Sequence, residues 1–331
     1  MKPALIALTI SVFFVACKAN SIQGITPPVA SDSALPAAYT GISAWGIDAP
    51  NDEDQAAFLA SGGTAGGPDG SRGYAQKSYA TPLTSLSQLP TITLGGELRF
   101  GPTTEDGLPA MLHKIHQGDA LRYQGNRSGL VYNFNIYHGH DYWFAWAFKL
   151  GTEWDVTKSG GHQDRVGLWD THQEIATIGN PAGLMWWGDS PAGKELWLWV
   201  EQMDGSGSAF LYNFPAIAGK WQRIIVHYRS GSAAQGPVFD AWTATGTAPF
   251  IKLSKSTDPY TGKPWTKTPP FGDPVNNTNG QADYMKLEIY KWTTIYYGDI
   301  PSRTMWSSGV FAREGADLYK NAVSALASYE K

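Results

Sequence analysis

Short segments in which apolar and polar residues alternate recur along the chain from about Thr91 onward. Alternation with a period of two is typical of strands that bury one face, because successive side chains point to opposite sides. Turn-forming residues separate the segments. We expect strands at residues 130–137, 142–150, 166–172, 196–201, 209–214, 223–228, 238–243 and 284–292. So many short strands predict an all-β sandwich of the jelly-roll type.

Helical periodicity is scarce, and only the C-terminal segment 316–329 predicts a helix. We expect Glu97-Leu98-Arg99 to lie in the first strand of the jelly roll. The Gly-rich segment 61–72 and the segment 258–280, which is rich in Pro, Gly and Asn, predict loops. Because no internal repeat and no second domain is evident, residues 41–331 are expected to form a single domain.

Composition supports this class of fold. The chain has 14 Trp and 16 Tyr, which favour pleated, half-buried surfaces, and its 37 Gly and 21 Pro suit many turns. A net charge of −4 argues against a nucleic-acid partner, which would need a basic surface. Any site for an acidic polymer must therefore gather its positive charge locally. Nothing in the sequence predicts an oligomer, and we expect a monomer.

The N-terminal residues predict export. Lys2 precedes an apolar run over residues 4–16, which is too short to span a membrane as a mature helix. The run ends in Phe14-Val15-Ala16-Cys17, which resembles a bacterial lipobox with Cys17 as the lipidated residue. Residues 1–17 are then a signal peptide, and residues 18–40, rich in Ala, Ser and Pro, a flexible tether.

These features predict a protein anchored by lipid in the cell envelope or periplasm, with no other contact to the membrane. An ordinary secretory signal and a secreted protein are the alternative. Cys17 is the only cysteine, so no disulfide can form within the chain.

The segment Tyr284–Trp292 carries the most informative alternation. Met285, Leu287 and Ile289 are expected to face the core. The opposite face would then carry aromatic and ionisable side chains suited to sugar rings and charges, namely Tyr284, Lys286, Glu288, Tyr290 and Trp292. An ordinary solvated sheet face would show the same pattern, so the pattern needs support from other strands.

Two other segments have a similar polar face. Arg127, Asn133 and Asn135 alternate with the apolar residues of segment 130–136. Asp170 and His172 share one face of segment 166–172. A lone histidine is more often structural than catalytic, but one that shares a groove with Tyr, Arg, Lys and Asn is a stronger candidate.

These segments together resemble the jelly-roll polysaccharide lyases of the alginate-lyase and heparin-lyase type, which have a concanavalin A-like fold. Tyr284 to Tyr290 resembles their Tyr-x-Lys-x-Gly-x-Tyr strand, and Arg127-Ser128-Gly129-Leu130 resembles their Arg-Ser-Glu-Leu strand. Trp169-Asp170-Thr171-His172 stands where they carry Gln-x-His. The order and approximate spacing of the segments also agree, over roughly residues 91–319.

Three positions depart from the family pattern. Gly129 replaces a Glu, Asp170 replaces a Gln, and Glu288 replaces a Gly. An ionised Asp170 cannot donate a hydrogen bond to a substrate carboxylate. Two added carboxylates in a site for a polyanion cost affinity unless they are paired or protonated.

The resemblance implies cleavage of a uronate-containing polysaccharide by β-elimination. Tyr290 would be the acid, and also the base if the elimination is syn. His172 would be the base or would neutralise the substrate carboxylate, to which Arg127 and Lys286 supply positive charge. Asn133 or Asn135 would donate the hydrogen bond that Asp170 cannot. We expect these groups to open into one groove, with His172 within about 12 Å of Tyr290, the reach of one sugar unit.

Two other functions are open. A non-catalytic carbohydrate-binding protein of the same fold would keep the aromatic groove and lose the chemistry. A retaining glycoside hydrolase would need paired carboxylates, and Glu153-Trp154-Asp155 resembles only the start of the laminarinase-type Glu-x-Asp-x-Glu pattern.

No metal or cofactor is predicted, although a structural calcium ion is left open. The pairs His113/His116 and His138/His140 have ligand-like spacing but no evident third ligand.

Overall fold

The strands of the protein form two antiparallel sheets, which we call sheet A and sheet B. The computed structural model describes residues 42–48, 64–65, 74–94, 96–116, 125–155, 165–173, 182–190, 193–257, 262, 264–272, 282–292 and 302–331. All of these residues belong to one unit, residues 33–331.

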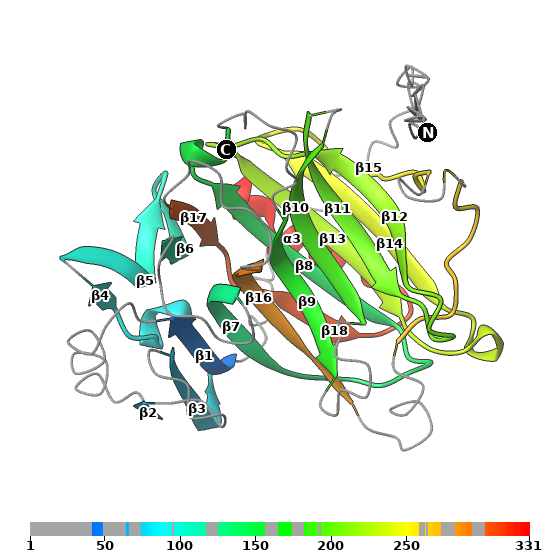
Figure 1. The fold of residues 1–331 in the computed structure, drawn as a ribbon, viewed down its shortest axis with the longest axis horizontal. Coiled ribbons are helices and arrows are strands. Elements are labelled where there is room, and N and C mark those ends of the chain that lie inside the picture. The colour runs from blue at the N-terminus through cyan, green and yellow to red at the C-terminus, as the bar shows by residue number, and fades with distance from the viewer. Residues whose placement is uncertain are drawn as a thin grey trace, which may run out of the picture. The chain divides into compact units, whose positions relative to one another are not determined.

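Sheet A has nine strands in the order β12-β11-β10-β9-β16-β7-β1-β3-β2. In Figure 1 the orange strand β16 runs between the green strands β9 and β7. The bounds in chain order are β1 Ile42–Asp48, β2 Thr64–Ala65, β3 Tyr74–Leu83, β7 Gly125–Ile136, β9 Arg165–Gln173, β10 Gly183–Ser190, β11 Gly193–Glu201, β12 Ser208–Pro215 and β16 Asp283–Trp292.

Sheet B follows the order β15-β14-β13-β8-β17-β6-β5-β4, with β18 paired to β8 as well. Its strands are β4 Ile92–Leu94, β5 Glu97–Glu105, β6 Leu108–His116, β8 Tyr142–Leu150, β13 Trp221–Arg229, β14 Val238–Thr245, β15 Ile251–Lys252, β17 Ser302–Ser307 and β18 Phe311–Glu314. Helix α3 covers Tyr319–Ala325, and short 3-10 turns lie at η1 Leu86–Gln88, η2 Thr152–Asp155, η3 Ala233–Gln235 and η4 Ala327–Tyr329.

The two sheets pack face to face around one large core. Trp146 of β8 stacks on Trp169 of β9 with ring centroids 5.2 Å apart, and both are fully buried. Phe134 of β7 meets Phe144 of β8 edge to face. Burying a large apolar side chain stabilises a fold by roughly 1.5–3 kcal/mol, so this shared layer holds the sheets together.

Strand β8 is buried on both faces, which explains its lack of alternation. Its even-numbered aromatic residues join the core between the sheets. Its odd-numbered residues, including Trp143 and Ala145, join a second apolar cluster with helix α3 on the other side of sheet B. Sheet B therefore has little free surface along β8, whereas sheet A has an outer face that no helix of the described residues covers in this way.

The strands expected from the sequence are confirmed, and the sandwich is the jelly roll that they predict. Strand β8 has the expected bounds, and β9, β13 and β16 begin or end within one or two residues of them. The expectation that Glu97-Leu98-Arg99 lies in the first strand of the jelly roll was wrong. Glu97 begins β5, and strands such as β1 and β3 precede it. The C-terminal helix is also shorter than expected, since the helical hydrogen bonds of α3 give way to the 3-10 turn η4.

Several expectations fall outside the described residues. The signal peptide, Cys17, the tether and most of segment 61–72 lie there, as does part of segment 258–280. Export and lipidation therefore stay predictions. No helix in the described residues is long and apolar enough to span a membrane.

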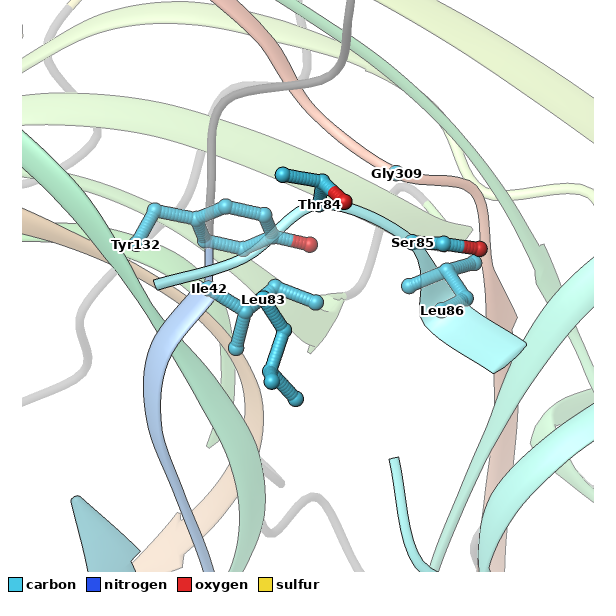
Figure 2. Close-up of a pocket in the computed structure, with 7 residues that line it drawn as sticks. All are labelled: Ile42, Leu83, Thr84, Ser85, Leu86, Tyr132 and Gly309. Carbon is cyan, nitrogen blue, oxygen red and sulfur yellow. The ribbon is translucent and has the colours of Figure 1, made fainter. Parts of the chain in front are cut away.

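Figure 2 shows a small cavity where β1, β3 and β7 meet the turn before η1. Its volume of about 10 Å³ is close to the least that admits one water molecule. A sugar does not fit in this cavity. The lining residues are Ile42, Leu83, Thr84, Ser85, Leu86, Tyr132 and Gly309.

Candidate active site

Strand β16 has the two faces that its sequence predicts. Met285, Leu287 and Ile289 are fully buried in the core between the sheets. Tyr284, Lys286 and Tyr290, on the opposite face, are partly exposed. The strand therefore presents its aromatic and ionisable side chains on the outer face of sheet A. Its neighbours in that sheet are β9 and β7 (Figure 1).

Arg127 and Tyr290 are two predicted residues that the fold brings into contact. They are directly opposite each other in the β16–β7 ladder. The guanidinium carbon of Arg127 lies 4.0 Å from the centroid of the Tyr290 ring, within the range of a cation–π contact. The predicted proton donor and the predicted carboxylate binder thus touch.

Lys286 and Asp170 form a second pair, opposite each other in the β16–β9 ladder. Lys286 Nζ lies 3.9 Å from Asp170 Oδ2 and 5.5 Å from the centroid of the Tyr284 ring. Burial alone would lower the pKa of Lys286, but the charges of Asp170 and Glu288 outweigh it, so its pKa is raised and the ammonium stays charged.

The departures at positions 129 and 288 are linked in space. Gly129 and Glu288 are opposite each other in the β16–β7 ladder. A Cβ atom on residue 129 would lie only 2.4 Å from the Cβ of Glu288, closer than real Cβ atoms come. The side chain of Glu288 therefore occupies the space that a side chain at position 129 would need.

We call Arg127, Asp170, Tyr284, Lys286, Glu288 and Tyr290 the catalytic cluster. Its two acids, Asp170 and Glu288, are buried, at 3% and 5% exposure. Burial raises the pKa of Asp170 to about 8, opposed by the charge of Lys286 and assisted by the charge of Glu288 and a hydrogen bond with it. Two carboxyl groups this close share a proton, because both cannot ionise without strong repulsion. With a pKa of about 8, Asp170 is mostly protonated at neutral pH.

Both tyrosines of the cluster rest in the protonated form. Burial raises the pKa of Tyr290, and Glu288 adds to this, although the charge of Arg127 and a hydrogen bond with it act the other way. Burial also raises the pKa of Tyr284, against the charge of Lys286. A protonated Tyr290 is the form that can donate a proton.

The expected proximity of His172 and Tyr290 is contradicted by strand pairing. His172 is opposite Tyr284, whereas Gly167 is opposite Tyr290. Gly167 and His172 are five residues apart, or about 17 Å along β9, so the backbones of His172 and Tyr290 are farther apart than the expected 12 Å. The register shift between Leu287 and Tyr290 brings Gly167 to this place. The side chain of His172 lies outside the described residues.

Three predicted binding residues lie at the margin of the cluster. Asn135 is exposed near the end of β7. Asn133 and Trp292 lie on β7 and β16, but their side chains are outside the described residues. A direct part for them in the site stays a prediction.

The hydrolase signature has a structural role instead. Glu153 Oε1 accepts a hydrogen bond of 2.6 Å from the backbone N–H of Thr304, and Trp154 Nε1 donates to the Thr304 carbonyl at 2.6 Å. Both residues thus tie η2 to sheet B.

The histidine pairs turn to separate partners. His113 Nε2 lies 3.0 Å from Ser307 Oγ, while His116 pairs with Glu97. His138 is buried near Asp283, and His140 pairs with Glu314. Among the described residues, no group of three or more His, Cys, Asp or Glu side chains could hold a metal ion.

One feature of this face was missed from the sequence. Trp197 and Trp199 were assigned to a strand but not to a site. The alternation Leu196-Trp197-Leu198-Trp199 was the available signal, since both leucines are buried in the core and the tryptophans must face outward. With Phe210 they form a separate aromatic cluster.

Comparisons with known proteins find similarity to solved structures alone. No protein-family model matches the sequence, and no curated protein matches it. The alginate lyase from Klebsiella pneumoniae has 12% identity and a TM-score of 0.46, with 83% of this chain and 97% of that chain covered. An exolytic PL7 alginate lyase from Zobellia galactanivorans has 11% identity and a TM-score of 0.43, with 69% and 94% covered.

A protein of another activity is similar too. The GH131 β-glucanase catalytic domain from Podospora anserina has 11% identity and a TM-score of 0.40, with 66% of this chain and 80% of that chain covered. Similarities with TM-scores below 0.5 carry no argument about the activity of this chain. The function must be argued from the residues on the outer face of sheet A.

Proposed function

We propose that this protein is a polysaccharide lyase that cleaves a uronate-containing polysaccharide by β-elimination on the outer face of sheet A. The observation that supports this best is the contact between Arg127 and Tyr290, 4.0 Å from guanidinium carbon to ring centroid. In this contact the Arg127 cation, which can bind a carboxylate, lies beside the Tyr290 hydroxyl, which can transfer a proton.

The first need of the reaction is neutralisation of the uronate carboxylate, which makes the proton on C5 acidic. Arg127 is the group for this step, because a guanidinium binds a carboxylate through two parallel hydrogen bonds. Lys286 adds positive charge on the same face. Charge aimed at the developing enolate is among the larger contributions to catalysis.

The two acids Asp170 and Glu288 are compatible with a polyanionic substrate, because Asp170 pairs with Lys286 and is mostly protonated at neutral pH. Arg127 and Lys286 are both cations, and Asp170 is mostly protonated below its pKa of about 8. At neutral pH Asp170 therefore adds little negative charge to the site. Asp170 and Glu288 are both buried, away from solvent.

The second need is proton transfer, for which we assign Tyr290 both steps. Its ionised hydroxyl takes the proton from C5, the C4–C5 double bond forms, and the bond from C4 to O4 breaks. The same hydroxyl then gives the proton to O4, so no proton is gained or lost overall. The distance of His172 along the sheet is the reason for assigning it no part in this step.

The test is Tyr290→Phe, which keeps the ring and removes the hydroxyl. On the best substrate among alginate, glucuronan and heparin, measured by absorbance of the unsaturated product, kcat should fall by about two to four orders of magnitude with binding largely kept. Because the raised pKa of Tyr290 leaves little of it ionised, wild-type kcat should also rise with pH through the neutral range.

Tyr319→Phe is the matched control, since Tyr319 is a half-buried tyrosine of α3 beside sheet B. Near-normal turnover by Tyr290→Phe would contradict the assignment, and loss of turnover in His172→Ala would restore a histidine base. A wild type that binds one of these polymers but cuts none would make the protein a carbohydrate-binding protein instead.

A further inference from the structure

An aromatic patch lies on the same outer face as the catalytic cluster. It consists of Trp197 and Trp199 of β11 and Phe210 of β12. Trp197 is partly exposed, whereas Trp199 and Phe210 are nearly buried. All three are separate from the core between the sheets, because the residues that flank them on their strands point into it.

The packing of the patch fixes the orientation of the exposed ring. Trp197 and Phe210 meet edge to face, with centroids 6.0 Å apart and planes at 85°. Trp199 packs against Phe210 at 5.9 Å. A tryptophan held in one orientation loses little entropy on binding, and its flat face suits the C–H face of a pyranose ring.

Strand pairing aligns the patch with the catalytic cluster. Tyr290 is opposite Gly167 of β9, which is opposite Trp186 of β10, which in turn is opposite Trp197. The row through Lys286 likewise leads to Trp199, by way of Asp170 and Leu184. Each row crosses three strand spacings, so the patch lies about 14 Å from β16 across the sheet.

We infer that Trp197, supported by Trp199 and Phe210, is a distal subsite that stacks a sugar ring of the polysaccharide bound at Arg127 and Lys286. The inference rests on the proposed function for its ligand class, a uronate polymer. Arg127 and Lys286 bind uronate carboxylates at one end of the polymer segment, and the Trp197 ring stacks on an apolar sugar face at the other end. Gly167, which has no side chain, lies beside Tyr290 on the path between them.

Chain length provides the test, because only an oligomer long enough to cross β9 and β10 reaches Trp197. Binding of size-fractionated alginate and glucuronan oligomers is measured by calorimetry. Trp197→Ala should weaken binding of octasaccharides about tenfold, the scale of one lost stacking contact, and should leave disaccharides unchanged. Trp197→Phe should restore part of the affinity. In turnover, KM for long chains should rise while kcat stays the same.

Trp242→Ala is the matched control, since Trp242 is a partly buried aromatic residue on the other side of sheet B. Trp197→Gln serves as a second variant, and thermal unfolding confirms that each variant is folded. Equal losses for short and long oligomers, or no loss for either, would overturn the subsite, as would a wild type that binds none of the oligomers.

The two proposals fail separately. A wild type that binds long chains through Trp197 but releases no unsaturated product contradicts the lyase and supports the subsite. A wild type that cleaves its polymer with a KM that Trp197→Ala leaves unchanged at every length contradicts the subsite alone.

Discussion

The proton held by Asp170 can be tested by replacing the acid with its amide. Asp170 is 3% exposed, and burial together with Glu288 raises its pKa to about 8 against the charge of Lys286. Asp170→Asn has nearly the same shape as the protonated acid and stays neutral at every pH. We therefore expect the variant to fold, and to gain stability relative to the wild type as the pH rises.

The sign and size of this effect follow from proton linkage. The pKa of Asp170 is about 8 in the folded protein and 3.8 in the unfolded chain. Between these values the folded state binds more protons, so the stabilisation is complete below pH 3.8 and is lost as the pH rises through 8. One such group changes the free energy of unfolding by at most about 1.4 kcal/mol per pH unit. Because Glu288 and Lys286 share the titration, we expect the variant to gain on the order of 2–4 kcal/mol from pH 5 to pH 8.

Denaturant unfolding of both proteins at pH 5, 6, 7 and 8 measures the difference. Asp240→Asn is the matched control, because pairing with Lys252 and Lys255 outweighs burial and lowers the pKa of Asp240. That carboxylate is ionised over the whole range, so its substitution should cost the same at each pH. A constant difference for Asp170→Asn would refute the shared proton, because it would mean that Asp170 is an ionised partner of Lys286 throughout.

The same titration should appear in ligand binding. Above pH 8 Asp170 ionises in the wild type, which adds one negative charge beside Arg127 and Lys286. Binding of a uronate polymer should then weaken in the wild type but persist in Asp170→Asn. Unchanged wild-type binding from pH 7 to pH 9 would show that this proton does not control the charge of the site.

Two further predictions concern neighbouring residues. Gly129→Ala brings a Cβ to 2.4 Å from the Cβ of Glu288, so it should destabilise the protein by about 1–3 kcal/mol. In a Glu288→Gly background the same substitution should cost clearly less. Equal costs in both backgrounds would contradict the steric coupling. Lys286→Ala should weaken polyuronate binding and make the remaining affinity less dependent on salt, whereas Lys252→Ala on sheet B should not; an unchanged salt dependence would exclude Lys286 from the site.

Much of the fold was predictable because strand alternation is a local property. The two faces of β16 follow from Met285, Leu287 and Ile289 alternating with ionisable and aromatic residues. Strand β8 was predictable from its continuous apolar run. Strands β1, β3 and β10 were not, because their sequences lack a clear alternation, and pairing with neighbours rather than local preference holds them in the sheet.

The candidate site was predicted only in part. The contact of Arg127 with Tyr290 agrees with the order of the motifs. The position of His172 does not, because the register of the β16–β9 ladder places it opposite Tyr284, six residues before Tyr290. No local pattern in the sequence predicts this register, which depends on how two strands more than a hundred residues apart align.

The sequence by itself determined which side chains share a face of each strand, because alternation depends only on the geometry of neighbouring residues. The tertiary structure decided which faces meet and at what register. It paired Glu288 with Gly129, aligned Trp197 with Tyr290 across four strands, and buried Asp170 beside a second carboxyl group. These outcomes set the charge and protonation of the site, because desolvation and Coulomb forces act between groups that only folding brings together.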